Sequence, residues 1–178
     1  MIHRAILDMA NELSPGGRSD LLEPDGPFQA ELFISAATHD DAVTFALVEA
    51  AARRLDLSQD EFLHSLGRYW IRFADSGSYG PLMRMAGDTL EEFVSNLDRM
   101  HEGVLDGLPG AITPRFELRA SEAGRLVVRY ISPRKGLEPF VGGLLRGLLD
   151  RFGLRGEVGA PSPAGDGFDF VVTFGQAA

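Results

Sequence analysis

The chain of 178 residues contains no cysteine. This absence excludes disulfide bonds, zinc sites built from thiolates, haem ligation by a thiolate and covalent haem attachment through a Cys-x-x-Cys-His motif. A chain of this length nevertheless buries enough surface to fold without a disulfide or a structural metal. We therefore expect a single domain that extends over residues 1–178.

The chain also has little positive charge and no long apolar run. Its 17 basic residues face 26 acidic ones, which gives a formal net charge of -9. Nucleic acids and anionic membranes attract cationic surfaces, so we expect neither as a partner. No window is apolar enough to cross a bilayer, and residues 1–13 lack the pattern of a signal peptide. These features predict a cytoplasmic protein.

Sequence motifs of common enzyme classes are missing as well. The chain has no Walker-type Gly-Lys-Ser/Thr, no Gly-x-Gly-x-x-Gly after a predicted strand and no Gly-x-Ser-x-Gly. We predict that the protein is not an enzyme.

Hydrophobic periodicity divides the chain into a mainly helical part, residues 1–110, and a part with strands and one helix, residues 111–178. Segment Ser14–Pro27, rich in Gly and Pro, is typical of a loop. Helix starts are indicated at Asp40-Asp41, by a capping box at Ser58–Glu61, and by an Asp variant of that box at Asp88–Glu91, with one helix expected from Asp88 to Val104.

In the second part the period changes to two, as in strands. Alternation around Phe116 and around Val128, separated by Glu122-Ala123-Gly124, predicts a hairpin. A helix is expected from about Pro139, followed by a last strand around Phe170. The order of the elements predicts an α+β fold, in which the N-terminal helical part packs on an antiparallel sheet of about four strands.

His101 lies on the apolar stripe of the helix predicted from Asp88. Such a histidine is more often part of the core, with a satisfied hydrogen bond, than a ligand. Of the residues three or four positions away, only Asp98 offers a second ligand, so a zinc or di-iron site is poorly supported. A single imidazole is what a pentacoordinate haem needs.

Tyr130, Ser132 and Arg134 are alternate residues, so an extended strand would place all three side chains on one face. Two hydroxyls and a guanidinium suit a ligand with two carboxylates, such as haem with its propionates. The same face continues through Leu126 and Val128, which favours an amphiphilic ligand. The alternative is a polar strand end with an exposed arginine.

At these residues the chain resembles the haem nitric oxide/oxygen-binding (H-NOX) family, to which the sensor domain of soluble guanylate cyclase and stand-alone bacterial gas sensors belong. The similarity covers about Phe62 to Phe152. The run into the family's axial histidine is matched by Gly67-Arg-Tyr-Trp70, Ser78-Tyr-Gly80, Gly87-Asp-Thr-Leu-Glu-Glu-Phe93 and Asn96-Leu-Asp-Arg-Met-His101, and its propionate signature by Tyr130-x-Ser132-x-Arg134 with Gly136-Leu-Glu-Pro-Phe-Val-Gly142 after it.

The resemblance implies a non-covalent haem b between the helical part and the sheet, with His101 as the axial ligand of the iron. Tyr130, Ser132 and Arg134 would hold the propionates. Pro114 stands where the family places a proline against the haem, although a proline is also common at the start of a strand.

The resemblance also predicts which gas is bound. At the position of the distal tyrosine of oxygen-binding members the chain has Pro139, with Phe140 beside it, and neither side chain donates a hydrogen bond to dioxygen. This predicts a sensor for nitric oxide, with CO as a second ligand, unless Tyr69 or Tyr79 reaches the pocket. Binding of NO would weaken the bond to His101 and release its helix from the sheet.

The resemblance implies an output through a separate signalling protein, such as a histidine kinase or a cyclic-di-GMP enzyme. A departure lies in Asn11–Gly26, which lacks the family's Tyr-Gly and Trp pattern. The alternative function is therefore a haem-free regulatory or interaction domain of the same fold, which binds another ligand or none.

Overall fold

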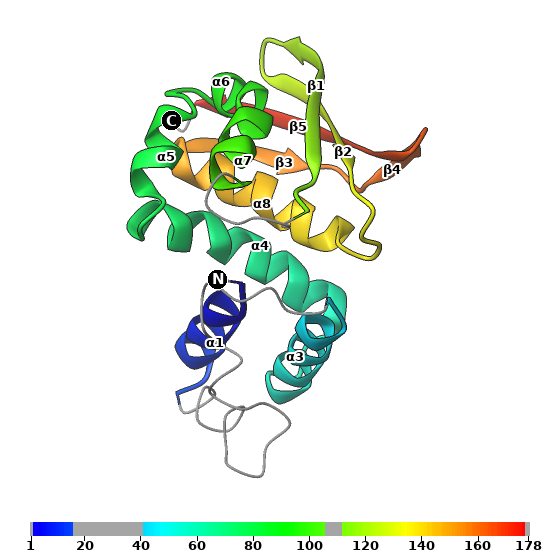
Figure 1. The fold of residues 1–178 in the computed structure, drawn as a ribbon. Coiled ribbons are helices and arrows are strands. Elements are labelled where there is room, and N and C mark those ends of the chain that lie inside the picture. Colours follow the sequence, from blue (N-terminus) through cyan, green and yellow to red (C-terminus); the bar gives the residue numbers. More distant parts are fainter. Residues whose placement is uncertain (1, 16–40, 106–111, 177–178) are drawn as a thin grey trace.

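The computed structural model describes residues 2–15, 41–105 and 112–176 (Figure 1). Seven helices and five strands lie in these ranges. The helices are α1 (Ile2–Leu13), α3 (Asp41–Arg54), α4 (Gln59–Ser76), α5 (Gly80–Met85), α6 (Leu90–Ser95), α7 (Leu97–Leu105) and α8 (Glu138–Arg151); the strands are β1 (Arg115–Glu122), β2 (Arg125–Ile131), β3 (Leu154–Val158), β4 (Ser162–Ala164) and β5 (Gly167–Gln176).

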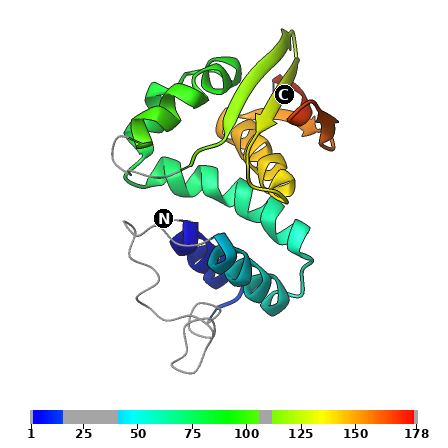
Figure 2. The ribbon, with the colours of Figure 1, turned by 45° about the vertical axis from the view of Figure 1, so that its right-hand side comes forward.

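The strands form one antiparallel sheet in the order β1-β2-β5-β3, with the short β4 paired to β5. Helix α8 lies between this sheet and α4, and α1 and α3 lie on the far side of α4 (Figures 1 and 2). Helices α6 and α7 pack against β1. The α+β prediction is confirmed, and the sheet has one strand more than the four expected, because the three-residue β4 is too short to show a period.

Glycines allow α4 and α8 to cross in close contact. A β-carbon on Gly67 would collide with the carbonyl oxygen of Phe140, and one on Gly143 with the carbonyl oxygen of His64. The glycine in the motif Gly67-Arg-Tyr-Trp70 is thus needed to pack α4 on α8.

The buried apolar side chains form two cores on the two sides of α4. The N-terminal core comprises residues of α1, α3 and the first half of α4, and the C-terminal core comprises residues of the second half of α4, α5–α8 and the sheet. Partly buried Trp70 and Leu137 contact both cores. The largest fully buried side chains include Phe62, Ile6, Leu7 and Leu47 in the N-terminal core and Phe93, Phe170, Leu126 and Leu145 in the C-terminal core.

One helix start and one hairpin are confirmed where local signals are strong. The Ser58–Glu61 capping box forms: the Ser58 hydroxyl accepts from the backbone N–H of Glu61, and the Glu61 carboxylate accepts from that of Ser58. The predicted hairpin turns at Glu122–Gly124, and Gly124 has a φ of 75°, which favours glycine.

The helix predicted from Asp88 to Val104 is wrong in two respects. The cap is Thr89, whose hydroxyl accepts from the N–H of Glu92, because Thr89 and not Asp88 stands directly before the first helical residue, Leu90. The helix also breaks at Asn96, whose side-chain amide donates to the carbonyl of Ala86 at 2.9 Å. Since Asn competes for backbone groups in this way, α6 ends there and α7 begins.

The loop predicted for Ser14–Pro27 and the divergent segment Asn11–Gly26 lie largely outside the described residues. Within the described ranges, no helix is long and apolar enough to cross a membrane.

Candidate functional site

His101 lies on α7 with its ring against the sheet. Its ring centroid is 5.9 Å from that of Phe116 on β1, and the Phe116 ring is 5.5 Å from that of Tyr130 on β2. Phe116 and Tyr130 are cross-strand partners, so their rings lie on the same face of the sheet. The fold thus joins the predicted iron ligand to the first residue of the predicted propionate signature through a single aromatic ring.

The His101 side chain is half-buried, and one of its ring nitrogens is buried and unused. Its Nδ1 has no hydrogen-bond partner within the described part of the chain. Burial lowers the pKa of His101 below its ordinary value of 6.5, although the nearby Asp98 and the Pro114 backbone carbonyl act in the opposite direction. A lowered pKa favours the neutral imidazole, which is the form that binds a metal.

The other groups near His101 do not complete a metal site of the zinc type. The described residues contain no group of three His, Cys, Asp or Glu side chains that would hold a metal ion. Asp98, the one candidate for a second ligand, instead accepts a hydrogen bond from the backbone N–H of Phe116. His101 is therefore suited to a cofactor that brings its own equatorial ligands, as haem does.

Tyr130 and Ser132 meet as expected. Tyr130 is only 3% exposed, and burial raises the pKa of its hydroxyl, while a side-chain hydrogen bond with Ser132 lowers it. The Ser132 hydroxyl in turn accepts from the backbone N–H of Arg134 at 3.1 Å. The three residues of the signature are thus linked to one another.

The expectation that all three lie on one face of an extended strand is wrong. Strand β2 ends at Ile131, and only Tyr130 belongs to it. Pro133 has no N–H with which to continue the ladder, and the Ser132 hydroxyl captures the N–H of Arg134 in a turn. A turn, rather than the strand period, brings the three side chains together.

Arg134 already binds a carboxylate. Its Nε lies 2.8 Å from both oxygens of Asp41, in the first turn of α3, and its Nη1 donates to the carbonyl of Ile112 at 2.7 Å. The sequence predicts Asp41 only as a helix cap, and nothing in the local sequence connects it to Arg134. The Arg134 guanidinium is therefore occupied by Asp41, and a second carboxylate would have to share it or displace Asp41.

The remaining predicted site residues are placed as follows. Pro114 is half-buried directly before β1, and its carbonyl lies close enough to His101 to affect the pKa. Pro139 is in the first turn of α8, and Phe140 packs against the N-terminal core. Tyr69 packs its ring under the Arg72 guanidinium, and Tyr79 packs against the C-terminal core.

An open cleft of about 820 Å³ lies elsewhere, between α1, α4 and α8. It is lined by charged side chains and crossed by three ion pairs, Arg72–Glu12, Arg68–Asp150 and Arg151–Asp75. Of the predicted site residues, Tyr69 lines it, whereas His101, Tyr130, Ser132 and Arg134 do not. Because its charged groups are already paired across the cleft, it is a weaker candidate for a ligand site than the surroundings of His101.

The residues around His101 therefore fit a haem. They offer an imidazole whose lowered pKa favours the neutral form and whose Nδ1 has no partner among the described residues, and an aromatic wall formed by Phe116 and Tyr130. They also offer the Arg134 guanidinium, which a propionate would share with Asp41 or take from it. Neither Pro139 nor Phe140 has a side-chain donor.

Comparison with known proteins identifies the family of the chain. The family model described as "Haem-NO-binding" matches residues 1–159. The chain is 27% identical over 93 residues to guanylate cyclase soluble subunit beta-2 of Rattus norvegicus, covering 52% of this chain and 14% of that protein. It is 29% identical over 113 residues to soluble guanylate cyclase gcy-37 of Caenorhabditis elegans, covering 61% and 16%. The chain thus spans a small part of these curated relatives.

Solved structures have the same fold. An H-NOX protein from S. oneidensis in the Fe(II)NO ligation state has a TM-score of 0.82 at 20% identity, with 98% of each chain covered. An unliganded Fe(II) H-NOX protein from K. algicida has a TM-score of 0.75 at 19% identity, with 99% of this chain and 96% of that chain covered. Since the family model matches most of the residues, the chain belongs to the haem-NO-binding (H-NOX) family, whose domain is a haem-based gas sensor and not a catalytic domain.

Proposed function

We propose that this protein is a haem-based sensor that binds nitric oxide at ferrous haem b and signals to a separate protein. The observation that supports it best is the half-buried His101 imidazole, whose buried Nδ1 has no partner among the described residues and which lies beside the Phe116–Tyr130 wall. A polar atom buried without a partner is costly, so its retention is explained if His101 has a ligand to bind.

The roles of the chain's own residues follow from their positions. His101 would hold the iron from α7, while Tyr130, Ser132 and Arg134 would hold the two carboxylates. Bound haem would supply the ferrous iron, the centre that takes the gas. Arg134 also binds Asp41 in the first turn of α3. A haem carboxylate held by Arg134 would therefore be linked to α3 through this arginine.

The choice of gas follows from missing donors. A polarised iron-dioxygen unit gains from a charge-assisted hydrogen bond, and nitric oxide depends on such a bond much less. Pro139 and Phe140 offer none. Tyr69 faces the cleft between α1, α4 and α8, where its ring contacts Arg72. We therefore propose selectivity for NO, with CO as a second ligand.

The test is the absorption spectrum of the haem-reconstituted, dithionite-reduced protein without gas, with NO and in air. We expect a five-coordinate ferrous Soret band that shifts with NO and is unchanged by brief exposure to air. The band should disappear in His101→Gly and return with free imidazole, while His64→Gly, at an exposed helical histidine, should keep it.

A stable oxy spectrum would overturn the selectivity for NO. Failure to retain haem after reconstitution would favour a haem-free regulatory domain of the same fold.

The partner is proposed to be a histidine kinase or a cyclic-di-GMP enzyme. Signalling by conformational change requires that the partner bind the NO-bound and NO-free forms with different affinity. Measuring the affinity of a candidate kinase for the two forms by titration calorimetry tests this, and equal affinities would exclude that kinase as the output.

A further inference from the structure

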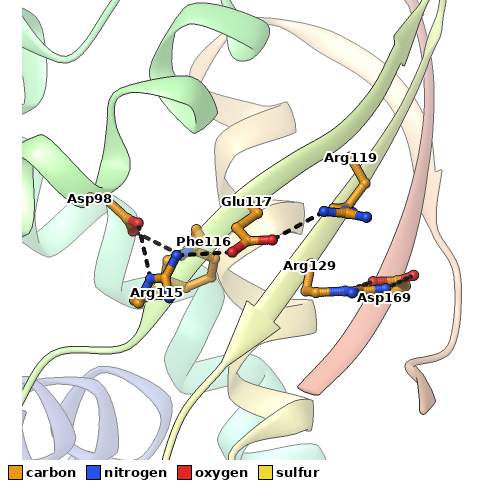
Figure 3. A network of polar contacts seen from close by, with 7 residues as sticks. All are labelled: Asp98, Arg115, Phe116, Glu117, Arg119, Arg129 and Asp169. Atoms are coloured by element: carbon orange, nitrogen blue, oxygen red, sulfur yellow. Dashed lines mark hydrogen bonds and ion pairs between the residues drawn. The ribbon is translucent and has the colours of Figure 1, made fainter. Parts of the chain in front are cut away.

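Asp98 lies on α7, three residues before His101 and therefore one helical turn away on the same side of the helix. Its carboxylate does not point to a metal site. One oxygen accepts a hydrogen bond from the backbone N–H of Phe116 at 2.8 Å, and the other lies 3.9 Å from Nε of Arg115 (Figure 3). The side chain thus connects α7 to the first residues of β1.

The N–H group of Phe116 has no partner from a neighbouring strand on this side. Among the strands of the described residues, β1 is at the edge of the sheet and pairs only with β2. Phe116 is 8% exposed, so an unsatisfied N–H there would be costly. Asp98 supplies the acceptor, and because the acceptor is charged the hydrogen bond is stronger than a neutral one.

Two contacts consequently join the same pair of elements at the same place. Asp98 binds the backbone of Phe116, and one turn later the His101 ring packs against the Phe116 side chain. Helix α7 therefore cannot move along or away from β1 without losing both contacts or displacing the strand.

Two separate groups of ion pairs lie on the outer face of the sheet, one along β1 and one between β2 and β5 (Figure 3). Arg115 pairs with Glu117 at 2.9 Å, and Glu117 with Arg119 at 3.4 Å. Glu117 lies opposite Arg129 in the register, and Arg129 makes two hydrogen bonds to Asp169 on β5. A displacement of β1 would therefore change contacts that reach the surface.

We propose that Asp98 is a positioning residue that fixes α7 on β1 and sets the orientation of the His101 ring against Phe116. The functional part of this inference rests on the proposed haem ligation by His101. The positional part concerns this chain's own residues and is testable without haem.

The test compares Asp98→Ala with Asp98→Asn in the full chain. Asparagine retains an oxygen that accepts from the Phe116 N–H but loses the charge, whereas alanine loses the acceptor. In haem-free protein, NMR would measure hydrogen exchange of the Phe116 amide and the chemical shifts of the His101 ring protons, which sense the Phe116 ring. In haem-loaded, reduced protein, resonance Raman would measure the iron–histidine stretching band.

We expect exchange of the Phe116 amide to become at least tenfold faster in Asp98→Ala, with shifted His101 ring protons and a shifted or broadened iron–histidine band. Asp98→Asn should restore most of each signal. Asp169→Asn, which removes an ion pair from the same sheet without touching α7, should change none of them.

Unchanged Phe116 exchange and unchanged His101 shifts in Asp98→Ala would overturn the proposal, as would a defect equally large in Asp98→Asn. If the natural sequence fails to bind haem, the proposed function fails, while the two NMR readouts still decide whether Asp98 positions His101.

Discussion

The two cores of the molecule are built differently. The N-terminal core is formed by helices alone, with small residues such as Ala5, Ala10 and Ala51 and one buried polar side chain, His3, whose Nε2 lies 2.8 Å from the Thr44 hydroxyl. The C-terminal core joins helices to a sheet that is cross-linked by strand pairing. His101, Phe116 and Tyr130 all belong to the C-terminal side.

This difference divides the domain into a C-terminal part with the candidate site and an N-terminal helical part. The C-terminal part carries the predicted ligands on α7, on β2 and in the turn after β2. The N-terminal part meets it through α4, the shared contacts of Trp70 and Leu137, and the Arg134–Asp41 pair. The signature residue Arg134 thus contacts α3 directly, through an exposed residue outside the N-terminal core.

The strongest way to test the division is to remove one large buried ring from each core. Phe62→Ala and Phe93→Ala should each lower the free energy of unfolding by about 3–5 kcal/mol. Hydrogen exchange should separate them: Phe62→Ala should speed exchange in α1 and α3 and leave β2 and β5 protected, whereas Phe93→Ala should expose the sheet. Identical exchange patterns in the two variants would mean that the cores unfold as one.

Gly143→Ala addresses the joint between the two cores. Because a β-carbon there would collide with the carbonyl of His64, α8 must move away from α4, and we expect a loss of about 1–3 kcal/mol in urea unfolding. Gly175→Ala on β5 is the matched control, since a β-carbon there meets nothing within 4 Å. A variant at Gly143 as stable as the one at Gly175 would contradict the close crossing.

Asp41→Asn removes the charge that joins Arg134 to α3. The pair is partly exposed, with 31% of the Arg134 and 50% of the Asp41 side chain accessible, so the loss should be about 1 kcal/mol or less. Glu49→Gln removes the exposed Arg53–Glu49 pair within α3 and should change stability even less. Equal thermal unfolding temperatures of the two variants would show that the Arg134–Asp41 pair contributes no more than an exposed pair within one helix.

The smallest effect concerns pH and the C-terminal core. The pKa of His101 is lowered in the folded chain, so the unfolded chain binds the proton more readily. His101 therefore reduces stability as the pH falls from about 6.5 toward its folded pKa and has no such effect above that window. The free energy of unfolding, measured with urea at several pH values between 7.5 and 5, should fall less steeply with falling pH in His101→Gln than in the natural sequence. An identical pH dependence in the two proteins would exclude the effect of burial on the pKa of His101.

Much of the fold follows from signals a few residues apart. The Ser58–Glu61 box, the turn at Gly124 and the alternation in β1, β2 and β5 each depend on hydrogen bonds or side-chain faces that neighbouring residues determine. The sequence does not predict the cap at Thr89, because the neighbouring Asp88 is an equally good capping residue. It does not predict the break at Asn96 either, because the carbonyl that the Asn96 side chain binds lies ten residues away, on Ala86.

The candidate site divides in the same manner. The sequence by itself determined that His101 stands on an apolar face and that Tyr130, Ser132 and Arg134 lie close together, since these depend on helical and local spacing. Only the tertiary structure decided that Asp41 occupies the Arg134 guanidinium from 93 residues away and that Asp98 binds the backbone of Phe116. These long-range pairs form because the packing of α3, α7 and β1 brings their residues together. Local sequence patterns do not determine which carboxylate accepts a hydrogen bond from which distant donor.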